Sequence, residues 1–149
     1  MATLGIDPGA GGGHGVVGDT AESSFAWKMP PSAPEAWARL RGEIAGEGVT
    51  DAYLEVVHAM PGQGVTSMFN FGKNYGWCEM ALAALGIRTH LVRPKVWQKE
   101  FGLLSKKGES KKDKKNRHKA EAMRLFPHIK VTHALADALL IAEYGRRQR

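Results

Sequence analysis

A chain of 149 residues can bury one hydrophobic core, and a composition of 43% hydrophobic and 24% charged residues is that of a globular domain. No apolar run approaches the roughly 20 residues of a membrane span, and a single cysteine, Cys78, excludes a disulfide framework and a cysteine-based zinc site. The composition therefore predicts a single cytosolic domain, spanning residues 1–149, with no membrane association and no signal peptide.

The net charge of +6 is concentrated in one segment. Residues 105–119 (SKKGESKKDKKNRHK) hold eight of the 21 basic and two of the 15 acidic residues, so the remaining chain carries 13 of each. Such a block typically marks a polyanionic partner, and a solvated surface helix is the alternative. We expect a basic, flexible segment around residues 104–119. Its candidate phosphate contacts are Lys106, Lys107, Lys111, Lys112, Lys114, Lys115 and Arg117.

The first part of the chain predicts three antiparallel strands. Residues 3–7 (TLGID) form a short buried strand, a glycine-dense turn covers residues 9–15, and two further strands are expected over residues 16–19 and 22–29. A Pro-Pro pair then breaks the pattern. An amphipathic helix follows over residues 33–46, with apolar side chains at helical spacing.

The second part of the chain predicts strands that alternate with helices. Strands are expected over residues 52–57 (AYLEVV) and 87–92. Helices are expected from an N-cap at Ser67 to Leu85, from Pro94 through PKVWQKEF, near residues 113–126, and over residues 132–144. Three antiparallel strands followed by such alternation is the organisation of an RNase H-like domain: an α/β fold with a five-stranded mixed sheet flanked by helices.

Three carboxylates lie within apolar elements. Asp7 ends the first strand, Glu55 lies inside the strand AYLEVV, and Asp137 lies in the helix HALADALLIA. Each one alone fits an edge residue, a cap or an ion-pair partner. Together they indicate a site, because buried carboxylates are costly unless they are paired or bind a cation.

The expected topology brings these acids together. Ligands of open α/β sheets gather beyond the carboxyl ends of the strands, where Asp7 and Glu55 lie. His133 precedes Asp137 by four residues and therefore shares its helical face. An oxygen-rich site with one imidazole suits Mg²⁺ or Mn²⁺, and two such ions can drive phosphodiester hydrolysis.

Three segments resemble the catalytic segments of RuvC-type Holliday junction resolvases: LGIDPG at residues 4–9, LEVVHAMPGQG at residues 54–64 and HALADALLIAEYG at residues 133–145. The middle one, which continues into SMFNFGKNYG, is most similar to small phage-encoded members. The resemblance implies a homodimeric Mg²⁺-dependent endonuclease that nicks branched DNA symmetrically, in the host cytoplasm if a phage encodes it. It also gives Asp7, Glu55 and Asp137 the roles of metal ligands.

One position departs from the family pattern. The family carries a fourth ligand, Asp or His, three residues before the last Asp, and this position is Ala134 here. His133 is the expected substitute, because residues three and four apart share a helix face. We therefore predict Asp7, Glu55, His133 and Asp137 as the catalytic and metal-binding set, with no other cofactor.

Two further features support DNA binding and assembly. His58, Met60 and Gln63 follow Glu55 in a loop, where the family places residues that stack on bases; His58 could stack on an unpaired base or be an ordinary loop histidine. Glycines at 72 and 76 permit close helix packing, either on the chain's own sheet or in a dimer. The resemblance favours the dimer.

Other classes fit the sequence less well. Residues 13–18 (GHGVVG) match G-x-G-x-x-G but precede a strand and Pro-Pro, not the helix that a dinucleotide site needs. An actin-like ATPase needs two such domains. A non-catalytic DNA-binding module leaves the three acids unexplained, because acids repel a phosphate backbone. A ribonuclease or rRNA-processing nuclease of the same fold stays open.

Overall fold

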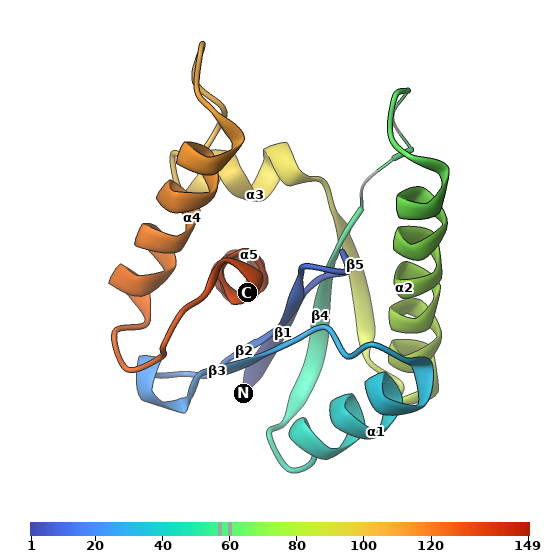
Figure 1. The fold of residues 1–149 in the computed structure, drawn as a ribbon. Coiled ribbons are helices and arrows are strands. Elements are labelled where there is room, and N and C mark those ends of the chain that lie inside the picture. Colours follow the sequence, from blue (N-terminus) through green and yellow to red (C-terminus); the bar gives the residue numbers. More distant parts are fainter. Residues whose placement is uncertain (57, 60) are drawn as a thin grey trace.

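The computed structural model describes residues 1–56, 58, 59 and 61–149, arranged around one five-stranded sheet (Figure 1). The strands are β1 (Ala2–Asp7), β2 (Gly13–Val17), β3 (Phe25–Lys28), β4 (Val49–Glu55) and β5 (Arg88–Val92). The helices are α1 (Ala33–Glu43), α2 (Val65–Ala84), α3 (Pro94–Glu100), α4 (Lys111–Leu125) and α5 (His133–Arg147), with a short 3-10 helix at Ala21–Ser23. In the part of the chain that the structure describes, no helix has the length and apolar character needed to cross a membrane.

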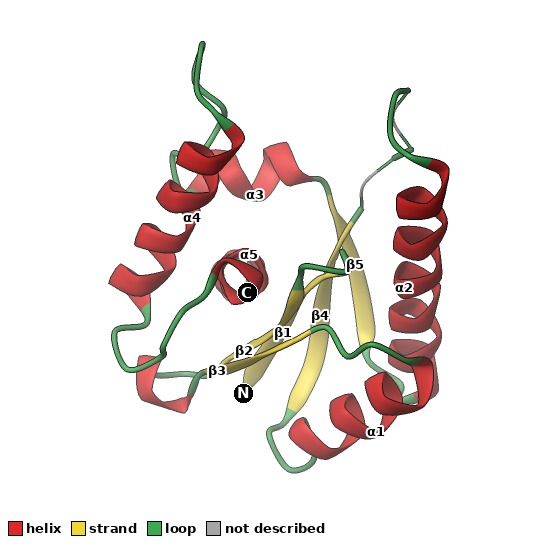
Figure 2. Cartoon of the chain, in the orientation of Figure 1, coloured by secondary structure: helices red, strands yellow, loops and turns green. Residues whose placement is uncertain are grey.

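The sheet has the strand order β3-β2-β1-β4-β5. Strands β1, β2 and β3 pair antiparallel, whereas β4 pairs parallel with β1, and β5 pairs parallel with β4. Helices α3, α4 and α5 cover one face, and α1 and α2 cover the other (Figure 2). This arrangement confirms the predicted mixed sheet with helices on both sides.

Alternation along the strands assigns side chains to the two faces. Leu4 and Ile6 of β1 and Leu54 of β4 belong to the core beneath α1 and α2. The intervening residues, including Asp7 and Glu55, therefore face α5, because successive side chains of a strand point to opposite faces. The two acids that end these strands are thus brought to the same face of the sheet.

Glycines allow α5 to lie directly against the strands. A Cβ atom at Gly5 would overlap the carbonyl oxygen of Ala138, and one at Gly15 would lie 2.9 Å from the same atom. Small residues on both sides let a helix backbone approach a sheet closely. The position of α5, and with it that of Asp137, therefore depends on these glycines.

Several boundaries differ from the prediction. Strand β2 begins at Gly13, inside the segment expected to be a turn, and ends two residues earlier than predicted, because its glycines pack beneath α5. Helix α2 begins at Val65 with Gly64 as its N-cap, so Ser67 is not the cap. Helix α4 begins at Lys111, since the Ser110 side chain caps it by accepting the backbone N–H of Asp113. Residue 57, the predicted end of the fourth strand, lies outside the described residues.

Candidate active site

The site is built at the carboxyl ends of two neighbouring parallel strands. Asp7 is the last residue of β1 and Glu55 is the last residue of β4. Ile6 pairs with Leu54 in the sheet, so the two acids follow side by side. Both face α5, which carries Asp137 on its second turn. The structure thus brings together the three carboxylates that the sequence pattern singled out.

A tight glycine turn surrounds the Asp7 carboxylate. The backbone N–H of Gly9 donates to Asp7 Oδ1 at 3.1 Å, and the N–H of Gly12 donates to the Gly9 carbonyl at 2.9 Å. A Cβ at Gly12 would lie within 2.8 Å of Asp7 Oδ1 and overlap the residue's backbone, so only glycine fits there. Glycine at this position therefore accommodates the side chain of Asp7.

Glu55 and Asp137 each accept a hydrogen bond from a buried side chain. The Nε1–H of Trp97, on α3, donates to Glu55 Oε2 at 2.6 Å. The Nδ1 of His118, on α4, lies 2.7 Å from Asp137 Oδ1. Sequence reasoning missed both residues. The available signal for Trp97 was a tryptophan in the mostly polar helix PKVWQKE, and for His118 it was a histidine four residues before an alanine, Ala122, in a lysine-rich helix.

Burial and electrostatic repulsion raise the pKa values of Asp7 and Glu55. Desolvation, with a smaller contribution from the Asp137 carboxylate, raises the pKa of Asp7 to about 6. Desolvation, and then the proximity of Asp7, raises the pKa of Glu55 to about 8, although the hydrogen bond from Trp97 acts in the opposite direction. Carboxylates in this state gain from any cation that enters between them.

The donor set suits a divalent metal ion. Within the described residues, neither Asp7 nor Glu55 forms an ion pair with Lys, Arg or His. Asp137 lies within ion-pair distance of His118. Carboxylate oxygens are the ligands that Mg²⁺ and Mn²⁺ prefer. However, no group of three His, Cys, Asp or Glu side chains in residues 1–56, 58, 59 and 61–149 is close enough together to hold a metal ion. The acids neighbour one another without forming a ready coordination shell.

His133 lies apart from these contacts. It is the first residue of α5, its side chain is exposed, and its Nε2 lies 2.9 Å from Asn116 Oδ1 on α4. Ala134, at the family position of the fourth ligand, carries no donor side chain. The structure thus brings Asp7, Glu55 and Asp137 together and gives His133 a different polar partner.

The basic residues divide into two groups. Lys106, Lys107, Lys111 and Lys112 are exposed, on the turn before α4 and on its first residues. Lys115 is exposed as well, whereas Arg117 and Lys114 have hydrogen-bond partners within the chain. Arg117 donates to Glu109 and to the carbonyl of Leu104, and Lys114 donates to Ser105 at 2.7 Å. The positive charge of Lys114 acts to lower the pKa of Glu55, and that of Lys115 acts to lower the pKa of Asp7, although burial keeps both values raised. Helix α4 therefore brings cations towards the acids.

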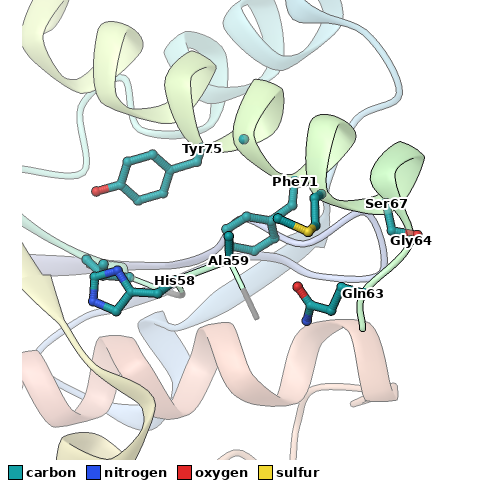
Figure 3. A pocket seen from close by; sticks show the side chains of 10 residues that line it. His58, Ala59, Gln63, Gly64, Ser67, Phe71 and Tyr75 are labelled. Atoms are coloured by element: carbon teal, nitrogen blue, oxygen red, sulfur yellow. The ribbon is translucent and has the colours of Figure 1, made fainter. Parts of the chain in front are cut away.

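A cavity adjoins the site beyond β4. It has a volume of about 570 Å³, and it lies between the segment after Glu55 and the first half of α2. Figure 3 shows the imidazole of His58, the rings of Phe71 and Tyr75, and Gln63 around this space. His58 therefore shares the lining of this cavity with two aromatic rings. Met60, the other residue expected in this loop, lies outside the described residues.

The strand order, the three antiparallel and two parallel pairings, and the placement of the helices define an RNase H-like fold. Over 99% of its length the chain is similar to Thermus thermophilus RuvC in complex with a Holliday junction substrate, with a TM-score of 0.68, 18% identity and 96% coverage of that chain. A further Thermus thermophilus RuvC structure gives a TM-score of 0.56 at the same identity and coverage. No protein-family model and no curated protein matches the sequence. The predicted fold class is confirmed.

Proposed function

We propose that this chain is a metal-dependent endonuclease that cleaves Holliday junctions or related branched DNA by phosphodiester hydrolysis. The observation that carries the proposal is the set of three neighbouring carboxylates, Asp7, Glu55 and Asp137, of which Asp7 and Glu55 have raised pKa values and form no ion pair among the described residues. The similarity of the fold to RuvC in complex with a Holliday junction substrate supports the proposal.

Mg²⁺ is the cation that this donor set favours, with Mn²⁺ as a substitute. Asp7, Glu55 and Asp137 would hold it through carboxylate oxygens. Ions held by these carboxylates would supply Lewis-acid chemistry, the activation of a water molecule and stabilisation of the leaving oxygen of the phosphodiester. His133 is our candidate for a fourth ligand, since it lies one helical turn before Asp137.

The surface around the acids suits a DNA backbone. The lysine-rich turn before α4 and the loop before α2 project from the same end of the molecule, at which β1 and β4 end (Figure 1). Lys106, Lys107, Lys111 and Lys112 are free to meet phosphates there. Contacts of this kind supply affinity without sequence information.

The cavity beside Glu55 suits an unpaired base. His58, Phe71 and Tyr75 offer ring faces for stacking, and branch points of DNA are where bases become unpaired. A base held there would lie next to the acids that cleave the backbone. This geometry favours branched DNA over intact duplex.

Symmetric cleavage requires a homodimer, and α2 offers a surface for one. Phe69 and Met80 are 69% and 68% exposed, and Gly72 and Gly76 lie between them along the exposed side of the helix. An exposed apolar stripe with small residues permits close packing of a second helix. We therefore propose that two copies associate through α2, and that the protein acts in the cytosol, where the buried Cys78 stays a thiol.

The decisive test compares substrates and acid variants. We expect a synthetic four-way junction to be nicked with Mg²⁺, and matched duplex, single-stranded DNA and an RNA–DNA hybrid to be cleaved far more slowly. Asp7→Asn, Glu55→Gln and Asp137→Asn should each abolish nicking, by at least about 100-fold, and leave junction binding intact, because losing a negative charge does not weaken contact with phosphates. His133→Ala in the same assay tests the fourth ligand.

Two outcomes would contradict the proposal. Preferred cleavage of the RNA–DNA hybrid would indicate a ribonuclease of this fold. Near wild-type nicking by any one of the three acid variants would remove that residue from the metal-binding set.

A further inference from the structure

Two buried side chains hydrogen-bond to carboxylates of the site, one to Glu55 and the other to Asp137. Trp97 Nε1–H donates to Glu55 Oε2 at 2.6 Å, and His118 Nδ1 lies 2.7 Å from Asp137 Oδ1. Both side chains are held in place by the surrounding protein, because Trp97 is fully buried and His118 is only 4% exposed. Each carboxylate is thus fixed through one oxygen by a side chain of another element.

The two donors also contact each other. The rings of Trp97 and His118 meet edge to face, with their centroids 5.3 Å apart. The contacts therefore run without a break from Glu55 on β4, through Trp97 on α3 and His118 on α4, to Asp137 on α5. Movement of either donor would turn the carboxylate that it holds.

The chemistry of the donors decides which oxygens remain free. An indole N–H donates only, so it takes up one lone pair of Glu55 Oε2, and Oε1 is the oxygen more open to a ligand. An imidazole N–H can donate from His118 Nδ1 to Asp137 Oδ1, because a carboxylate oxygen is an acceptor. In metal sites, side chains that hydrogen-bond to the ligands orient those ligands and raise their affinity for the ion.

We propose that Trp97 and His118 are positioning residues, which fix the Glu55 and Asp137 carboxylates so that one oxygen of each is presented to a divalent cation. This inference rests on the proposed function. It assigns to α3 and α4 a part in metal binding that goes beyond covering the sheet and carrying lysines.

The opposite face of the sheet holds a matched pair for comparison. His14 and Trp27 are also buried and stack on each other with centroids 4.9 Å apart. Within the described residues, however, His14 Nδ1 and Trp27 Nε1 have no hydrogen-bond partner. Substitution of Trp27 therefore removes a buried indole N–H without removing a bond to a carboxylate.

The test measures Mn²⁺ binding to the DNA-free protein by calorimetry, on variants whose folding is verified by circular dichroism. Trp97→Phe and His118→Leu should each weaken Mn²⁺ binding by about 10- to 100-fold, the usual effect of losing such a partner. His118→Asn should recover most of the affinity, because its amide N–H can donate from the position of Nδ1. Trp27→Phe, the matched control, should bind Mn²⁺ like the wild type. The Mn²⁺ concentration for half-maximal nicking should follow the same order.

The outcomes separate this inference from the proposed function. If the wild type binds Mn²⁺ in a manner that Asp7→Asn abolishes, but Trp97→Phe and His118→Leu bind it within twofold of wild type, the positioning role is wrong and the metal centre stands. If His118→Leu fails to fold, Trp97→Phe alone decides by the same criterion. If the wild type binds no Mn²⁺ that depends on Asp7, both proposals are overturned.

Discussion

Asp7 and Glu55 have pKa values of about 6 and about 8, raised chiefly by burial, whereas their ordinary values are 3.8 and 4.5. Above pH 4 to 5 the unfolded chain has therefore lost protons that the folded, metal-free protein still holds. The stability that these bound protons contribute is fully present at pH values below the ordinary pKa values. It is lost as the pH rises through about 6, where Asp7 loses its proton, and then about 8, where Glu55 does. The metal-free site thus opposes folding on the alkaline side.

Removing the charge of Glu55 should accordingly stabilise the metal-free protein. We expect Glu55→Gln to raise the melting temperature at pH 8, measured in chelator by calorimetry, by about 6 °C, which corresponds to about 2 kcal/mol for a chain of this size. The gain should vanish at pH 5, where the native carboxyl is already protonated. An equal gain at both pH values would show that packing, not ionisation, is responsible.

The three acids could be predicted from the sequence, whereas their partners could not. Asp7, Glu55 and Asp137 each interrupt an apolar pattern, and this is visible along the chain. The bond from Trp97 to Glu55 joins residues 42 apart, and that from His118 to Asp137 joins residues 19 apart, across different elements. Local periodicity contains no information about such contacts, because they arise only when α3 and α4 pack on the sheet.

At the scale of elements, strand and helix types followed from periodicity and the boundaries did not. The glycines of residues 13–15 predict a turn by composition, yet they extend β2 because α5 requires a surface without side chains. The lysine-rich segment has no apolar period to mark a helix. The helix begins at Lys111 because the Ser110 side chain caps it, accepting a hydrogen bond from the backbone N–H of Asp113.

The turn before α4 carries the element-scale prediction about DNA affinity. Lys106→Ala with Lys107→Ala should weaken binding to all branched DNAs alike and lower the slope of log K against log salt by about 2, since each lost phosphate contact contributes about 0.9. Fluorescence anisotropy from 50 to 200 mM salt measures this slope. Lys130→Ala with Arg149→Ala removes two exposed charges that lie outside the lysine-rich segment and serves as the control. An unchanged slope in the Lys106 and Lys107 variant would mean that these lysines form only a solvated surface.

At the scale of the whole molecule, one chain offers one set of acids, whereas a four-way junction has two strands to cut. Pairing through α2 would supply the second set and relate the two by a two-fold axis. The exposed side of α2 contains apolar side chains that a monomer gains nothing by exposing, Phe69 and Met80 among them. Lys73 lies over the rings of Phe69 and Trp77, at 5.8 and 5.5 Å from their centroids, and leaves the glycine positions uncovered.

Gly76 allows the proposed dimer to be tested without disturbing the fold. A Cβ at Gly76 meets no atom within 4 Å in the single chain, so Gly76→Leu should leave the monomer intact and even favour α2 by about 1 kcal/mol, because glycine is a poor helix former. In a dimer the same leucine would block close approach of the two helices. Light scattering at micromolar concentration should therefore give about twice the 16.2 kDa chain mass for the wild type and the single-chain mass for Gly76→Leu.

Gly42→Leu on α1, where a Cβ also meets nothing within 4 Å, should remain dimeric. On a junction carrying labels on both scissile strands, Gly76→Leu should nick one strand at a time, while the wild type and Gly42→Leu cut both within one binding event. A wild type that scatters as a monomer, or a Gly76→Leu variant that still dimerises, would exclude α2 as the interface.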